Sequence, residues 1–67
     1  MTFGDAMRAA RKRRGIKQKD LAAMIGASQP YLSDIEHNRV PGGWRLRKDI
    51  AEVLKDPDVD AIVRPQQ

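Results

Sequence analysis

The chain has 67 residues, no cysteine and a formal net charge of +4 at pH 7. This length fits one small domain, and a chain without cysteine forms neither disulfides nor thiolate metal sites. The single histidine, His37, cannot hold a metal by itself, so no metal and no other cofactor is expected. The longest apolar stretch, residues 21–27, is too short to span a bilayer, and the first residues lack the features of a signal peptide. We therefore expect a cytoplasmic protein without membrane contact.

The charges are distributed unevenly along the chain. Residues 1–48 contain 11 basic and 4 acidic side chains, a balance of +7, whereas residues 49–67 contain 2 and 5, a balance of −3. A basic body favours a polyanionic partner, with nucleic acid ahead of an anionic membrane surface. The alternative is that these charges only solvate a small protein.

Apolar side chains spaced three and four residues apart predict short helices and no strands. The first three predicted helices run from Phe3 to Gly15, from Gln18 to Ile25 and from Gln29 to a left-handed turn at Asn38. The side chains expected in the core are Phe3, Met7, Ala10, Leu21, Ala22, Met24, Ile25, Leu32 and Ile35. Gly15 and Gly26 are suited to end a helix, and the Ser28 hydroxyl is suited to cap the third helix at the Tyr31 N–H. Lys17 offers no such cap to the second helix.

The second half of the chain contains a loop and a fourth predicted helix. The loop covers residues 40–43, with the sequence Val-Pro-Gly-Gly. In the helix that follows, Leu46, Ile50 and Leu54 share one face and are expected in the core. Trp44 stands at the start of this helix and is expected to be a core or lid residue.

A brief fifth helix is predicted after Asp56, which serves as its N-cap with proline in the first turn. Its apolar side chains, Val59, Ile62 and Val63, either complete the core or form a dimer contact. Pro65 is expected to end this helix and residues 65–67 to fray. The expected fold is all-α, a compact bundle of four to five short helices.

Residues 18–36 have the features of a helix-turn-helix. Ala22 is small where the two helices cross, and Gly26 supplies the left-handed conformation of the short turn. In such a motif the second helix is held so that it enters the major groove of DNA. An ordinary helical hairpin is the alternative interpretation. The expected organisation is a DNA-binding domain over residues 1–56, followed by a short C-terminal helix and tail over residues 57–67.

Residues 3–54 resemble the phage repressor and Cro type of helix-turn-helix domain, also called the xenobiotic-response-element family. The matching residues are Arg11, Arg14, Gly15, Ile16, Gln18, Leu21, Ala22, Gly26, Ala27, Ser28, Leu32, Ser33, Ile35, Glu36, Ile50, Ala51 and Leu54. The resemblance implies a lambda-repressor-like bundle of five helices, binding to operator DNA as a dimer and control of transcription.

The resemblance also implies roles for individual residues. The residues that would face base edges are Gln29, Pro30, Ser33 and Asp34. Gln18, Asn38 and Arg39 would lie at the DNA backbone, and Arg11 and Glu36 would form an internal ion pair.

Side-chain chemistry agrees with part of this assignment. The amide of Gln29 can donate and accept at once, which matches adenine, while Ser33 can serve either base type. Asp34 has no evident protein partner and is expected to accept from cytosine N4. Lys17, Lys19 and Tyr31 are expected to join the backbone contacts.

The sequence therefore predicts a DNA-binding transcriptional regulator, a repressor that acts by occupying its operator as a homodimer and associates with the nucleoid. The alternative is a protein-interaction module, antiactivator or antitoxin-like, suggested by the acidic residues Asp34 and Glu36 and by the acidic C-terminal part. An enzyme is not expected, although Ser33, Asp34 and His37 are close together in the sequence, because one helix supplies neither a pocket nor an oxyanion site.

Overall fold

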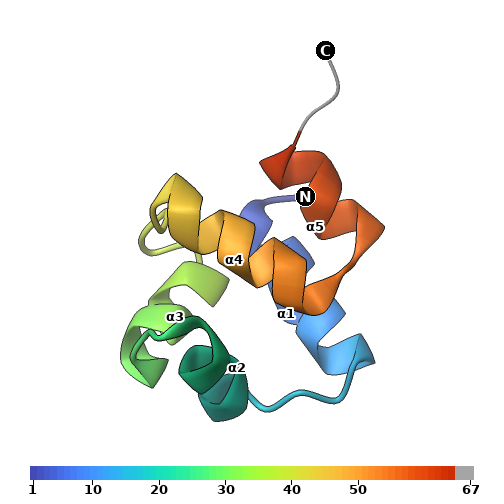
Figure 1. Ribbon diagram of the computed structural model, residues 1–67. Coiled ribbons are helices and arrows are strands. Elements are labelled where there is room, and N and C mark those ends of the chain that lie inside the picture. The colour runs from blue at the N-terminus through green and yellow to red at the C-terminus, as the bar shows by residue number, and fades with distance from the viewer. Residues whose placement is uncertain (65–67) are drawn as a thin grey trace.

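The computed structural model describes residues 1–64, which form five α-helices (Figure 1). The helices are α1 (Phe3–Arg13), α2 (Gln18–Ile25), α3 (Gln29–Glu36), α4 (Trp44–Leu54) and α5 (Pro57–Val63). No strand occurs within these 64 residues, which confirms the predicted all-α fold. The expected fraying of residues 65–67 lies outside the described part of the chain.

The helix ends follow from local chemistry. The Ser28 hydroxyl accepts the Tyr31 N–H at 3.3 Å and so caps α3. Gly26 ends α2 with φ of 70°, and Asn38 takes the turn after α3 with φ of 60°. Lys17 precedes α2 without a side-chain capping bond, so the first N–H groups of α2 have no side-chain acceptor at the cap.

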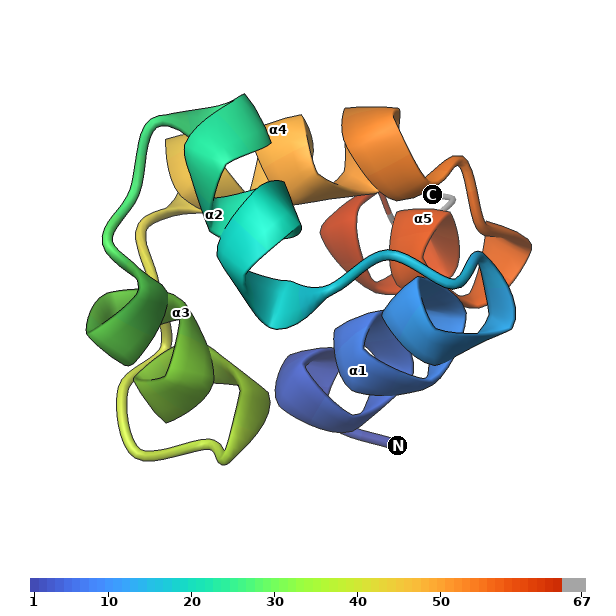
Figure 2. The same ribbon diagram turned by 90° about the horizontal axis from the view of Figure 1, so that it is seen from below.

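The core lies where α1 and α4 meet the other helices. α1 packs against α3, α4 and α5, while α4 also packs against α2 (Figures 1 and 2). The buried apolar side chains are Phe3, Ala6, Met7, Ala10, Leu21, Ala22, Leu32, Ile35, Ile50, Ala51, Leu54 and Val59. The pair α2–α3 therefore occupies one side of the molecule and α5 the other, with α4 between them (Figure 1).

Two residues expected in the core are exposed instead. The side chain of Trp44 is 70% exposed and that of Met24 is 60% exposed. Trp44 is the first residue of α4 and shares the side of Ala51, seven residues later, but the buried part of α4 begins only at Ile50, so Trp44 lies at the unburied end of the helix. Met24, at about 100° per residue, lies about a quarter turn away from the buried stripe of α2. The interpretation of Met24 as core was therefore wrong, and of the two roles expected for Trp44, core or lid, the core role was wrong.

Helix α5 is held to the body by apolar contacts and by an ion pair. Val59 is fully buried, while Ile62 and Val63 are half-buried against the core. Arg13 Nη2 lies 2.6 Å from Asp56 Oδ2, which joins the end of α1 to the start of α5. This pair could not be predicted from local sequence patterns, because its two residues are 43 positions apart.

The Arg13–Asp56 pair is expected to make stability acid-sensitive. The hydrogen bond from Arg13 holds the pKa of Asp56 below its ordinary value of 3.8. A carboxyl group whose pKa is lower in the folded state stabilises the fold above pH 3.8, and this contribution is lost as the pH falls through the folded-state pKa. We expect Asp56→Asn, which keeps a capping oxygen, to be less stable than wild type at pH 7.

The deficit of Asp56→Asn should shrink as the pH falls below about 3.8, because wild type then loses the same contribution. Urea midpoints measured from pH 7 to pH 2 would show this convergence. Asp49→Asn, at an exposed position of α4, is the control and should follow wild type throughout. A deficit that is equal at every pH would contradict the role of the Asp56 charge.

Candidate nucleic-acid interface

Helix α3 presents a polar face to solvent. Its apolar side chains, Leu32 and Ile35, are buried against the rest of the bundle. The residues of its outer face are Gln29, Pro30 and Tyr31, which are exposed, and Ser33 and Asp34, which are partly exposed. All five side chains are at least partly accessible to solvent, so the outer face of α3 is open to a large ligand.

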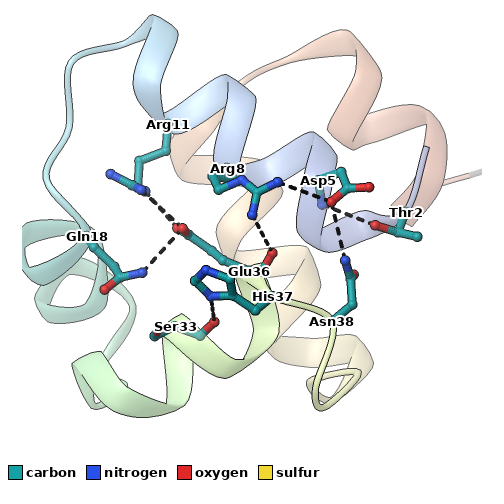
Figure 3. A network of polar contacts seen from close by, with 9 residues as sticks. All are labelled: Thr2, Asp5, Arg8, Arg11, Gln18, Ser33, Glu36, His37 and Asn38. Carbon is teal, nitrogen blue, oxygen red and sulfur yellow. Dashed lines mark hydrogen bonds and ion pairs between the residues drawn. The ribbon is translucent and has the colours of Figure 1, made fainter.

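A buried ion pair fixes the position of α3 (Figure 3). Arg11 Nε lies 2.7 Å from Glu36 Oε2 and Arg11 Nη2 lies 3.1 Å from Glu36 Oε1, so the contact is bidentate. The third nitrogen of the guanidinium, Nη1, donates to the Ile16 carbonyl at 2.9 Å. The Glu36 side chain is only 1% exposed. The ion pair implied by the family resemblance is thus present, and it joins α1 to the end of α3.

The same carboxylate begins a chain of hydrogen bonds toward the start of α3. Gln18 Nε2 donates to Glu36 Oε1 at 3.3 Å, and Gln29 Nε2 donates to Gln18 Oε1 at 3.3 Å. Gln18 therefore lies between the ion pair and Gln29, and orients the Gln29 amide. The Gln29 amide keeps its oxygen and one N–H for another molecule, which are the two groups that a bidentate contact to adenine requires.

The first turns of α1 hold the other end of α3. Arg8 Nη1 donates to the Glu36 carbonyl at 3.4 Å, and Asn38 Nδ2 donates to Asp5 Oδ1 at 3.3 Å (Figure 3). Hydrogen bonding with Thr2 lowers the pKa of Asp5, so this carboxylate stays charged in the contact. A side chain at Gly4 would meet the Glu36 carbonyl at 2.9 Å, which shows how closely the α1 backbone approaches α3.

Asp34 has a partner that the sequence analysis did not find. Arg39 Nη1 lies 3.2 Å from Asp34 Oδ1. The backbone N–H of Arg39 also donates to the Asp34 carbonyl at 2.9 Å, because the left-handed turn at Asn38 folds the chain back. In the sequence, the only feature that indicated this contact was the left-handed turn expected at Asn38.

The sequence places charged or polar residues at both ends of α3. Lys17, Gln18 and Lys19 lie at the start of α2, which the Gln18–Gln29 hydrogen bond joins to the start of α3. Asn38 and Arg39 follow the other end of α3 and are exposed. The predicted backbone-binding residues therefore flank the face that carries the predicted base-reading residues, except Tyr31, which lies on that face.

The arrangement of Ser33, Asp34 and His37 does not resemble a catalytic site. The Nδ1 atom of His37 lies 2.8 Å from the Ser33 carbonyl oxygen, not at its hydroxyl, and the Asp34 carboxylate is paired with Arg39. Within residues 1–64 no three potential metal ligands come together, and no helix is both long and apolar enough to cross a membrane.

Comparison with known proteins agrees with this geometry. The family model described as Helix-turn-helix matches residues 7–55, which include the whole of α2, α3 and α4. No curated protein and no solved structure matches the chain. The matched residues cover more than half of the sequence and contain the open face of α3 and the contacts that hold it. The chain therefore belongs to the Cro/C1-type helix-turn-helix family, whose members are DNA-binding regulators and not enzymes.

Proposed function

We propose that this protein is a sequence-specific transcriptional repressor that inserts α3 into the major groove of its operator and acts by occupying that site. The open polar face of α3, opposite a fully buried apolar face, is the observation that carries the proposal. A helix of this kind fits the width of the major groove, where every base pair presents a distinct pattern of donors and acceptors.

In this proposal the base-reading residues are Gln29, Pro30, Ser33 and Asp34. Gln29 reads adenine with its free oxygen and N–H, since Gln18 already holds its second N–H. Ser33 lies one helical turn after Gln29 on α3, and its hydroxyl contacts the edge of a nearby base. Pro30 offers apolar contact, for example to a thymine methyl group.

The proposed backbone contacts come from both ends of α3. Lys17, Lys19, Tyr31 and Asn38 are exposed there, and Gln18 keeps one N–H free of its two protein partners. The start of α2 has no side-chain cap, so its first backbone N–H groups can donate hydrogen bonds to a phosphate oxygen. Arg39 differs from these five residues because its guanidinium is already paired with Asp34.

We also propose that two copies bind together, with their α3 helices one turn of DNA apart, about 34 Å. The side of the molecule away from α3 supports this arrangement. A hollow of about 640 Å³ lies between α4 and α5, and Trp44, Ile62 and Val63 contribute apolar surface to it. A contact there between subunits would cover the exposed indole of Trp44 and leave both α3 helices free.

The same hollow supports the second candidate function, a module that binds another regulator. Arg47 and Lys48 line it, together with Arg64 and its ion-pair partner Glu52, so the lining has a net positive charge and an acidic apolar segment of another protein would also fit it. The two functions differ in what they require of α3, because only the repressor needs the open polar face. Binding to duplex DNA therefore separates them.

Duplex binding is expected to depend steeply on salt. Lys17 and Lys19 of two subunits would together neutralise about four phosphates, which predicts a loss of roughly 10²-fold in affinity between 50 and 200 mM salt. Fluorescence anisotropy with a random duplex over this range measures the slope. A weak and salt-independent response would favour the protein partner over the operator.

Two variants separate base reading from backbone contact. Gln29→Ala is expected to remove about 1–3 kcal/mol of discrimination at one base pair and to leave affinity for random DNA unchanged. Lys19→Ala is the matched control and is expected to weaken binding to all sequences alike, with the salt slope reduced by about 1. Both side chains are exposed, so neither change should affect folding. If Gln29→Ala weakens specific and random DNA equally, the assignment of α3 is wrong.

A further inference from the structure

Arg39 is attached to Asp34 of α3 at two points, once through its backbone and once through its side chain. Its backbone N–H donates to the Asp34 carbonyl at 2.9 Å, and its Nη1 lies 3.2 Å from Asp34 Oδ1. The first contact fixes the start of the side chain and the second fixes its end. Arg39 thus lies beside the last turn of α3, although it belongs to the loop that follows.

This attachment changes the chemistry of the outer face of α3. Helix α3 itself contains no lysine or arginine, and Asp34 alone would present only acceptors to the groove. With Arg39 attached, the same position presents a guanidinium whose Nε and Nη2 are not used by Asp34. The pair is close to neutral overall, so it gains less from a phosphate than a free arginine does.

We propose that Arg39 is a specificity-determining residue that reads guanine, and that Asp34 is the positioning residue that aims it. The inference rests on the proposed function, because it requires α3 to lie in the major groove. Guanine presents two acceptors there, O6 and N7, and the planar fork of arginine matches both. Asp34 acts on base choice through Arg39 and does not accept from cytosine. Arg39 in turn leaves the group of backbone contacts that the family resemblance implied.

Arg39 could contact the DNA backbone or read guanine. The two roles predict different results for Arg39→Lys, which keeps the positive charge but removes the planar guanidinium fork. A backbone contact depends on charge, so Arg39→Lys would bind all sequences almost as wild type does. A guanine contact depends on the bidentate fork, so Arg39→Lys would lose base preference while the salt slope stays constant. The side chains of Arg39 and Asp34 are 63% and 42% exposed, so the variants should fold as wild type does.

The test uses the duplex that the full-length protein selects, with each guanine replaced in turn by 7-deazaguanine, which lacks the N7 acceptor. Wild type is expected to lose about tenfold in affinity or more at one such position. Arg39→Lys should show no loss at that position, and Lys19→Ala, the control, should show the same loss as wild type. The inference would be overturned if 7-deazaguanine reduced the affinity of Arg39→Lys as much as that of wild type. It would also be overturned if no such replacement reduced the affinity of wild type.

Asp34→Asn tests the positioning role. It keeps an oxygen acceptor but removes the charge that holds Arg39, so it should lose sensitivity to the same 7-deazaguanine while its affinity for random DNA does not fall. Loss of preference at a separate cytosine, with the guanine effect intact, would show that Asp34 reads a base by itself and would overturn its role. A wild-type protein that selects no duplex at all would instead contradict the proposed function.

Discussion

Replacement of Arg11 by alanine is expected to lower the free energy of unfolding by about 3–5 kcal/mol. The reason is that Glu36 remains behind, 1% exposed, without the guanidinium that donates a hydrogen bond to each of its carboxylate oxygens. A small domain has a total stability of about 5–15 kcal/mol, so this variant is expected to unfold partly at low concentrations of denaturant. Urea unfolding followed by circular dichroism measures the change.

An exposed ion pair of the same protein provides the control. Arg64 and Glu52 lie 3.4 Å apart with both side chains more than half exposed, so Arg64→Ala should cost less than about 1 kcal/mol. The double variant Arg11→Met, Glu36→Leu should recover much of the loss, because it removes the buried charge together with its partner. Equal losses in Arg11→Ala and Arg64→Ala would contradict the importance of the buried pair.

Replacement of Gly4 by alanine is expected to lower stability by about 3 kcal/mol and to abolish specific DNA binding. The added methyl group would lie against the Ile35 carbonyl and 2.9 Å from the Glu36 carbonyl, which are backbone atoms at the end of α3. These atoms cannot turn aside as a flexible side chain can, so α3 has to move away from α1. Thermal unfolding and anisotropy with the selected duplex measure the two effects.

Gly43→Ser is the matched control, because it adds a side chain where no atom lies within 4 Å. It also supplies a capping hydroxyl to α4, which has none, and should leave stability unchanged or slightly raised. Wild-type stability in Gly4→Ala would show that the contact between α1 and α3 tolerates a side chain and would contradict the prediction.

The helices could be predicted from the sequence because their determinants are local. The glycine at position 26, the capping serine at position 28 and the left-handed asparagine at position 38 each act on neighbouring residues. Apolar spacing identified most of the core for the same reason. Met24 was misassigned because its hydrophobicity was weighted above its angular position on α2. Trp44 was misassigned because it is the first residue of α4, and the buried part of that helix begins only at Ile50.

The tertiary polar contacts could be predicted only where a family pattern existed. Arg11 and Glu36 are 25 residues apart, and their pairing was implied by resemblance and not by spacing. Arg13–Asp56 joins residues that no local rule connects, and Asp34–Arg39 depends on how the turn at Asn38 directs the chain. Asp34 was therefore expected to lack a protein partner, and the structure corrects this.

Selection of bound duplexes from a random pool tests most directly whether α3 reads bases. The proposed role of α3 predicts an enriched motif of two inverted half-sites, with centres about 10–10.5 base pairs apart. It also predicts that Gln29→Ala selects the same motif with one position in each half-site relaxed. A pool that remains random after selection, or a motif that Gln29→Ala leaves unchanged, would contradict it.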